Sequence, residues 1–421
     1  MRILRASFIV ATLALATSGA REPVRDPLDV ATAAELEEAL SGPRHDAVVR
    51  LAPGVYQLTP ESAIDSSCGN CADPDTLVPI TVGLTISGRN LRIEGPRDGT
   101  ATIVTRAGYG LYFKDCADCE LERVTLTGGE RDTSGLATDA AIVATRSSVT
   151  IANCVVRDNI GSADLIAKHT VGIMGVCGRE GSDLTIERCE ILRNSWDGIA
   201  LYRAARATIS NNLIDGIDGA GVEAGGGRGV AIGVTWNGEA TIERNLVRKY
   251  WKGIGVFVDA DVVARGNIVE GMRTWGISVW DADQGRPRAV IERNVVYDCG
   301  ACGVAITRKA AYDENEPRGR LVTNIVVHTG QNSKYDAPDY YCYQCALALH
   351  AVPEEFSIRG NVFYDNREAD GAPFDEDTTR EMFWRERRGW VRTFRNTGAG
   401  VDERVKFHES AFLTEYPRWW D

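Results

Sequence analysis

The segment ATIERNLV at residues 240–247 decides the fold, because variants of it recur through the middle of the chain. Each variant has an apolar residue, two variable positions, then Asn or Cys, and then an apolar pair. The other copies are LTIERCEIL (184–192), ATISNNLI (207–214), AVIERNVV (289–296), RLVTNIVV (320–327) and FSIRGNVF (356–363).

The fourth position of this pattern gives the period. Its occupants lie 22 to 37 residues apart. A minimum unit in the twenties with variable insertions is typical of a solenoid, in which each repeat buries its apolar face against its neighbours. The position is filled by Val124, Cys154, Cys189, Asn212, Asn245, Asn267, Asn294, Asn324 and Asn361.

A second segment follows these positions and identifies the repeats as strands. Its residues are rich in Val and Ile and alternate, so we expect Ile199 and Leu201 to face inward and Ala200 and Tyr202 outward. No helical period is present, so an all-β parallel β-helix with coils about 4.8 Å apart is favoured over a leucine-rich repeat. The copies are WDGIALY (196–202), WKGIGVF (251–257), TWGISVW (274–280), ACGVAIT (301–307) and QCALALH (344–350).

The N-terminus and the charge indicate the compartment. Residues 1–20 have two arginines, an apolar run and small residues before a cleavage point, which predicts a signal peptide and export to the periplasm or beyond. No other apolar run is long enough to span a membrane. The net charge of −12 does not suit nucleic acid or an anionic membrane. The oligomeric state is left open.

Four segments follow from these patterns. After the signal peptide, residues 21–58 contain AAELEEAL and VVRLAPGVY, which predict a helical cap over the first coil. Residues 59–366 form the β-helix. The repeat is absent from residues 367–421, where charged and aromatic residues predict a C-terminal capping tail.

Eight of the eleven cysteines form CxxC pairs. Export favours disulfides over zinc or redox chemistry, either within a pair or between stacked coils, where Cys302 and Cys345 share a position. Cys177 is expected to remain a thiol. The paired residues are Cys68 and Cys71, Cys116 and Cys119, Cys299 and Cys302, and Cys342 and Cys345.

The two recurring segments, together with the opening AAELEEAL…VVRLAPGVY (33–56), resemble the pectin-lyase-like superfamily of right-handed parallel β-helix proteins. The resemblance covers roughly residues 28–366. It implies the fold and a polysaccharide partner. The motifs of the hydrolases and epimerases of this superfamily are absent, and no convincing lyase motif is present, so no single reaction is implied.

The outward side of the glycine-led strand is the expected binding groove. Its small residues leave room for a sugar chain, and its aromatic residues offer faces for sugar rings. The alternative is an aromatic ladder that only stabilises the sheet. The expected substrate-binding residues are Phe257, Trp280, Arg203, Asp259 and Asp281.

In lyases of this fold a cation on the equivalent sheet acts as base or neutralises the uronate. The resemblance therefore implies catalytic roles for Arg308 and Lys309, with Tyr202 and His350 as proton carriers.

The Gly-rich loop 215–229 carries Asp215, Asp218 and Glu223, which are hard oxygen ligands suited to Ca²⁺. The alternative is a solvated acidic turn.

Three functional hypotheses remain. The first is an exported protein that binds an acidic polysaccharide and cleaves it by β-elimination, as a polysaccharide lyase. The second is a non-catalytic envelope or adhesion protein. The third is a polysaccharide hydrolase that uses Asp259 and Asp281.

Overall fold

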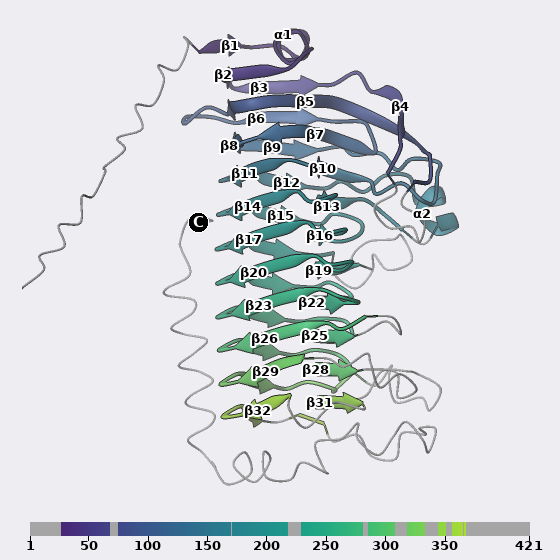
Figure 1. The fold of residues 1–421 in the computed structure, drawn as a ribbon, viewed down its shortest axis with the longest axis vertical. Coiled ribbons are helices and arrows are strands. Elements are labelled where there is room, and N and C mark those ends of the chain that lie inside the picture. The colour runs from purple at the N-terminus through teal and green to yellow at the C-terminus, as the bar shows by residue number, and fades with distance from the viewer. Residues whose placement is uncertain are drawn as a thin grey trace, which may run out of the picture.

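The computed structural model describes residues 27–67, 75–169, 171–217, 229–280, 285–307, 318–332, 344–350, 356–364 and 366–367. The signal peptide at 1–20 and almost all of the predicted C-terminal tail lie outside this part of the chain. The described residues form a stack of parallel β coils (Figure 1). They include two short helices, α1 (Ala33–Ala39) and α2 (Ala163–His169).

The strands fall into two hydrogen-bonded sheets. The larger sheet contains β1 (Leu28–Val30), β2 (Arg44–Leu51), β4 (Glu61–Asp65), β5 (Val78–Glu94), β7 (Tyr109–Ala117), β8 (Cys119–Glu122), β10 (Ala140–Thr145), β11 (Ser148–Ala152), β13 (Met174–Arg179), β14 (Asp183–Glu187), β16 (Ile199–Leu201), β17 (Arg206–Ser210), β19 (Val230–Val234), β20 (Glu239–Glu243), β22 (Lys252–Phe257), β23 (Asp261–Arg265), β25 (Trp275–Trp280), β26 (Arg288–Glu292), β28 (Cys302–Thr307), β29 (Arg318–Val322), β31 (Cys345–His350) and β32 (Ser357–Arg359). The smaller sheet contains β3 (Gly54–Gln57), β6 (Ala101–Val104), β9 (Val124–Thr127), β12 (Val155–Arg157), β15 (Glu190–Leu192), β18 (Leu213–Asp215), β21 (Leu246–Arg248), β24 (Ile268–Glu270), β27 (Val295–Tyr297), β30 (Ile325–Val327) and β33 (Val362–Tyr364).

Each coil contributes one strand to each of three faces. The larger sheet supplies two faces, because β5 runs through both. We call the ladder β7–β10–β13–β16–β19–β22–β25–β28–β31 face 1 and the ladder β8–β11–β14–β17–β20–β23–β26–β29–β32 face 2. The smaller sheet is face 3. Every pairing along these ladders is parallel, so the predicted right-handed parallel β-helix is confirmed.

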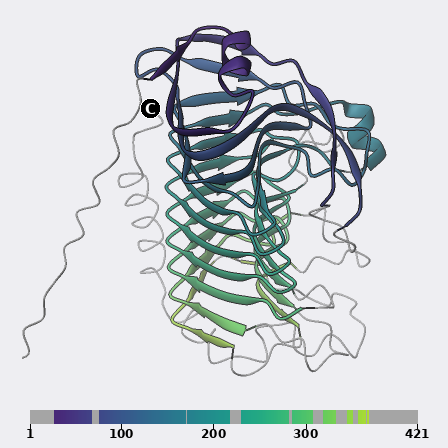
Figure 2. The ribbon, with the colours of Figure 1, turned by 45° about the horizontal axis from the view of Figure 1, so that its top comes forward.

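The N-terminal end of the stack carries α1 (Figure 2). Thr32 caps this helix in a capping box: its hydroxyl accepts from the Glu35 N–H, and the Glu35 carboxylate accepts from the Thr32 N–H. Leu36 is fully buried in the main core, which fills the interior of the coils. The amphipathic pattern at 33–40 thus contains the helix Ala33–Ala39, whose apolar residue Leu36 faces the core.

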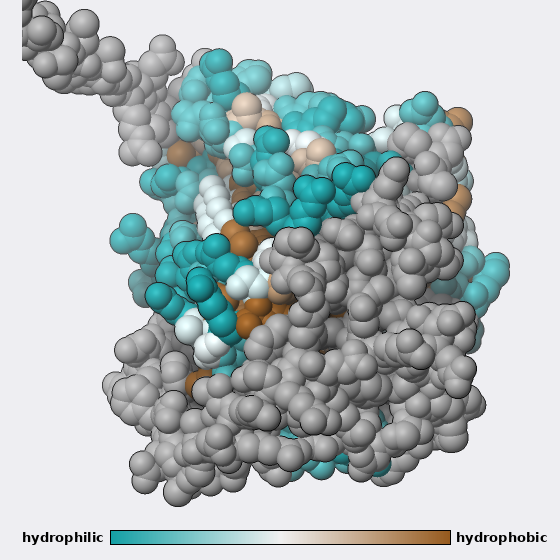
Figure 3. Space-filling model, turned by 60° about the horizontal axis from the view of Figure 1, so that its bottom comes forward, coloured by the Kyte–Doolittle hydropathy of each residue, from teal (hydrophilic) through white to brown (hydrophobic). Residues whose placement is uncertain are grey.

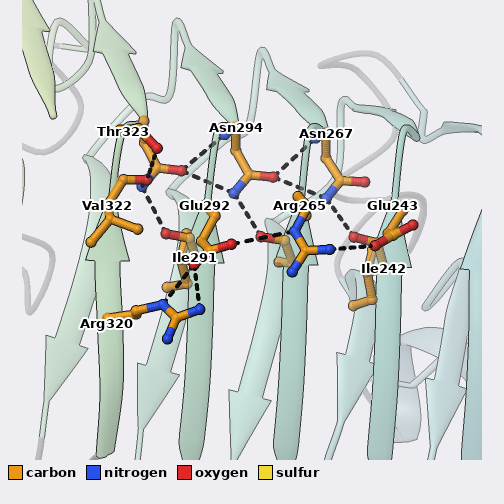
Figure 4. A network of polar contacts seen from close by, with 12 residues as sticks. Ile242, Glu243, Arg265, Asn267, Ile291, Glu292, Asn294, Arg320, Val322 and Thr323 are labelled. Carbon is orange, nitrogen blue, oxygen red and sulfur yellow. Dashed lines mark hydrogen bonds and ion pairs between the residues drawn. The ribbon is translucent and has the colours of Figure 1, made fainter. Parts of the chain in front are cut away.

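The Asn position forms a hydrogen-bonded column inside the coils (Figure 4). The Asn267 amide and backbone N–H both donate to the Asn294 side-chain oxygen at 2.9 Å, and the Asn294 amide donates to the Asn324 oxygen at 3.0 Å. The same amide donates to the Ala264 carbonyl. The column supplies hydrogen-bond partners for the buried backbone groups of the turn between faces 2 and 3.

Charged residues line the outside of the coils. Arg265 lies between Glu243 and Glu292, at 3.2 and 3.3 Å, on three successive coils. On the face shown in Figure 3 the described surface is mainly hydrophilic, and apolar residues reach it only in patches.

No disulfide joins two of the described cysteines, and Cys116 and Cys119 are buried thiols, so the disulfide prediction is not supported in this part of the chain. Cys299 faces the main core, whereas Cys302 belongs to a cluster outside the coil, so these two cannot pair across the strand. Cys302 and Cys345 do stack in register as expected, with their sulfur atoms 3.8 Å apart and not bonded. Cys68, Cys71 and Cys342 lie outside the described residues.

Candidate functional site

The outward side of face 1 has a floor of small residues, as predicted. One register position runs across six coils, and all of its members are buried. The Phe257 ring covers Gly255, because an added Cβ there would lie 2.3 Å from it, whereas an added Cβ at Gly233 would have no neighbour closer than 3.5 Å. The members are Ala200, Gly233, Gly255, Ser278, Ala305 and Ala348.

The alternation predicted for the glycine-led strand is wrong at its first residue. Gly253 faces the interior, where an added Cβ would lie 2.5 Å from a Val269 methyl, and Ile254 also faces inward. Two successive inward positions require a bend, which glycine permits. The residue before the glycine is consequently turned outward. This places Lys252, Trp275, Cys302 and Cys345 in one external row.

A cleft of about 470 Å³ opens above face 1 between β16 and β25. Four successive coils contribute to it, so it extends along the helix axis. Six of its lining residues are aromatic, and two others, Asp197 and Lys252, have ionisable side chains. The lining residues are Trp196, Asp197, Tyr202, Gly229, Val230, Gly233, Thr235, Trp236, Trp251, Lys252, Phe257, Val258 and Trp280.

Lys252 is held among aromatic rings. Its ammonium lies 4.5 Å from the ring centre of Trp275, 5.6 Å from that of Phe257 and 6.0 Å from that of Trp280. The Phe257 and Trp280 rings meet edge to face with their centres 6.4 Å apart. Ring faces attract cations, so this arrangement fixes a positive charge beside apolar surface.

Asp197 is the acid of the cleft. Its carboxylate accepts a hydrogen bond of 2.6 Å from the Val230 N–H. Burial raises the pKa of Asp197 to about 7, against the opposing effects of that hydrogen bond and of the nearby Lys252 charge. The Tyr202 hydroxyl also interacts with this carboxyl, and burial raises the pKa of Tyr202 well above its usual value. A carboxyl in this state can exchange a proton near neutral pH.

Three of the predicted site residues lie in the cleft. Phe257 and Trp280 line it in adjacent register, and Trp280 is 38 % exposed. Tyr202 lines it too, but only 8 % of its surface is exposed, because Met174 and Asp197 lie against its hydroxyl.

Two predicted residues lie at or beyond the rim. The Arg203 guanidinium sits 5.8 Å from the ring centre of Trp236 and 3.8 Å from Glu180. Asp259 is exposed and accepts from the Arg286 N–H; it follows the lining residue Val258 in the chain but does not itself line the cleft.

The other predicted catalytic residues, and Asp281 of the predicted substrate-binding set, are not placed. Arg308, Lys309 and Asp281 lie outside the described residues. His350 ends β31 in register with Thr307, and its side chain is likewise outside the described part. Sequence reasoning missed Lys252 and Asp197, although the recurring W-[DK]-G motif at 196–198 and 251–253 carries both.

The predicted calcium ligands are only partly described. Asp215 ends β18 on face 3, where its carboxylate pairs with the Arg248 guanidinium at 2.8 Å. The negative charge of Asp215 is therefore balanced by Arg248 on the next coil. Asp218 and Glu223 lie outside the described residues, and no group of metal-ligating side chains occurs within the described ones.

The chain belongs to the family described as the right handed beta helix region, whose model matches residues 85–233 and 174–336. No curated protein sequence matches it. Neither described helix is long and apolar enough to cross a membrane.

Solved structures that resemble this chain do so at low identity. An alginate lyase from Paenibacillus sp. strain FPU-7 is 14% identical, covers 81% of this chain and 98% of its own, and has a TM-score of 0.43. The adhesin PfbA of Streptococcus pneumoniae is 11% identical over 77% of this chain and 75% of its own, with a TM-score of 0.46. An exopolygalacturonase from Thermotoga maritima is 12% identical over 81% and 94%, with a TM-score of 0.47. Identities this low say nothing about the activity of this chain.

Proposed function

We propose that the cleft on face 1 binds an acidic polysaccharide. The observation that carries this proposal is the Lys252 ammonium held among the rings of Trp275, Phe257 and Trp280. A uronate sugar presents a carboxylate and an apolar C–H face, and a cation set in aromatic surface complements both. The export predicted from residues 1–20 would deliver the protein to where such polymers occur.

Binding is tested with pectate, alginate and glycosaminoglycans by affinity electrophoresis and calorimetry. Lys252→Met keeps the apolar stem and removes the charge, so we expect affinity to fall by about tenfold or more, ~1.4 kcal/mol. Lys114→Met, an exposed lysine on β7, is the matched control and should bind like the native protein. Equal affinity of Lys252→Met and Lys114→Met would reject the site.

Asp197 favours a second, catalytic function, cleavage of the bound polymer by β-elimination. The ionised carboxylate would take the proton from C5 of the uronate, the C4–O4 bond would break, and a C4–C5 double bond would form. The Tyr202 hydroxyl would donate its proton to the leaving oxygen and regain one from Asp197 through their interaction. Lys252 would neutralise the uronate carboxylate.

The catalytic function is tested by the ultraviolet absorbance of the unsaturated product. Asp197→Asn retains an acceptor for the Val230 N–H but no base, so we expect product formation to be lost while affinity changes little. In the native protein the rate should rise as pH increases through about 7, because the base must be ionised. Binding without any unsaturated product from the native protein would leave the non-catalytic adhesion function.

A further inference from the structure

The outward side of face 1 is covered on the N-terminal coils. A second apolar cluster, separate from the main core, fills the space above β5, β7, β10, β13 and β16. β4, which pairs antiparallel with the first part of β5, lies beside this region (Figure 1). The segment 130–139 contributes Ala137 to the cluster and contacts Thr81 through Asp132. The cluster consists of Val78, Ile80, Val82, Tyr109, Tyr112, Ala137, Ala140, Val143, Met174, Cys177, Ala200 and Tyr202.

Buried polar contacts attach β4 to face 1. The Tyr109 hydroxyl donates to the Asp65 carboxylate at 2.7 Å and shares a hydrogen bond of 2.9 Å with Thr138. Arg179, on the outward side of β13, forms a buried ion pair with Asp65 and donates to the Ser67 carbonyl. A charge pair removed from water is costly to separate, so β4 is held firmly on the sheet.

The segment 130–139 is attached in the same manner. Arg131 and Asp139 form an ion pair whose side chains are fully buried. Asp132 accepts from the Thr81 hydroxyl at 2.7 Å and from the Thr81 N–H at 3.1 Å. The Arg131 guanidinium also donates to the Val171 carbonyl at 3.1 Å. This covering is therefore a fixed part of the fold.

The covered region ends where the cleft begins. Tyr202 belongs both to the second apolar cluster and to the lining of the cleft. In the outward register row, the occupants change from Tyr112, Val143 and Cys177 on covered coils to Gly233 on an open one. The cleft is thus closed on its N-terminal side by Tyr202 and the cluster behind it.

We propose that the cleft binds the end of an acidic polysaccharide chain and not an internal stretch. This inference rests on the proposed binding function. A polymer lying along the helix axis would meet the packed cluster at Tyr202 and has no path beyond it. The volume of about 470 Å³ lies within the ~300–1,000 Å³ of sites that enclose a small ligand, which suits a short terminal segment.

The test is calorimetric titration with size-separated pectate and alginate fragments, from short oligomers to the intact polymers. Binding at chain ends predicts one protein molecule per chain and an affinity per mole of chain that does not change with length. Several protein molecules per long chain, with affinity per mole of chain rising with length, would overturn the inference while preserving the binding function.

Two further outcomes bear on the proposed function as well. Lys252→Met should weaken the one-per-chain binding by about tenfold or more. If it does not, the ends are bound elsewhere, and both the inference and the proposed binding site are wrong. Absence of binding to every fragment and polymer would reject both the end recognition and the acidic polysaccharide function.

Discussion

Asp197 is a carboxylic acid placed where water cannot solvate its charge. Burial favours the protonated form and raises its pKa from 3.8 to about 7. The folded protein therefore holds a proton on this group between pH 4 and 7 that the unfolded chain releases. Stability must fall with rising pH across that window, because the folded state binds more protons. The contribution of the protonated Asp197 to the free energy of unfolding is complete below about pH 4 and lost above about pH 7.

We predict that Asp197→Asn has a smaller loss of thermal stability between pH 4 and 7 than the native protein, since an amide does not ionise. The difference should reach a few kcal/mol near pH 7. Asp139, whose pKa burial also raises to about 7, is present in both proteins, so its contribution cancels. Parallel curves of melting temperature against pH would show that Asp197 is solvated in the folded protein.

At the scale of the element, the Asn column joins successive coils by side-chain hydrogen bonds as well as by backbone ladders. Asn294 accepts two hydrogen bonds from Asn267 and donates two others, to Ala264 and Asn324. Its loss would leave buried donors and acceptors on both neighbouring coils without partners. Such groups cost about 1–3 kcal/mol each when no water replaces the partner.

Asn294→Ala should therefore lower the free energy of unfolding by roughly 2–4 kcal/mol, as measured by chemical denaturation. Arg288→Ala is a suitable comparison on the same coil, since it removes only an exposed ion pair with Asp261 and should cost less than ~1 kcal/mol. Equal effects of the two substitutions would mean that water fills the gap left by the amide.

The glycine-led strand shows what its pattern predicts and what it does not. The repeat predicts the register, the outward Phe257–Trp280 row and the small floor, because stacked coils place equivalent positions together. It does not predict the bend at Gly253, and a one-residue change in alternation reverses the faces of its neighbours. Lys252 was missed for that reason.

At the scale of the whole molecule, the sequence did not predict the packing between segments that lie far apart in the chain. Tyr202 was expected at an open surface, yet its cluster includes residues as early in the chain as Val78. Nothing local in β4 or in the segment 130–139 indicates that Asp65 will pair with Arg179, 114 residues away. The sequence repeat indicates how the coils are spaced along the chain. The covering occurs only once, so no repeated pattern predicts it.

The covering also makes the solenoid unequal along its axis, which gives the last prediction. In a solenoid each coil is stabilised by its own packing and by its neighbours, so local opening free energies can differ from end to end. β10 and β13 pack against the main core on one side and the second cluster on the other. Among the described residues, the outer cluster at β28 and β31 is smaller, with Ala and Cys for all but Trp275.

We therefore expect slower amide hydrogen exchange in β10 and β13 than in β28 and β31, measured by mass spectrometry on the native protein. The face 3 strands of the same coils do not contact the second cluster and act as the internal control. Their exchange rates should differ less between these coils. Because the Asp65–Arg179 ion pair fixes the covering, Asp65→Asn should speed exchange in β10 and β13 while leaving β28 unchanged. Uniform exchange along the axis would contradict this, since it would mean that the coils open only together.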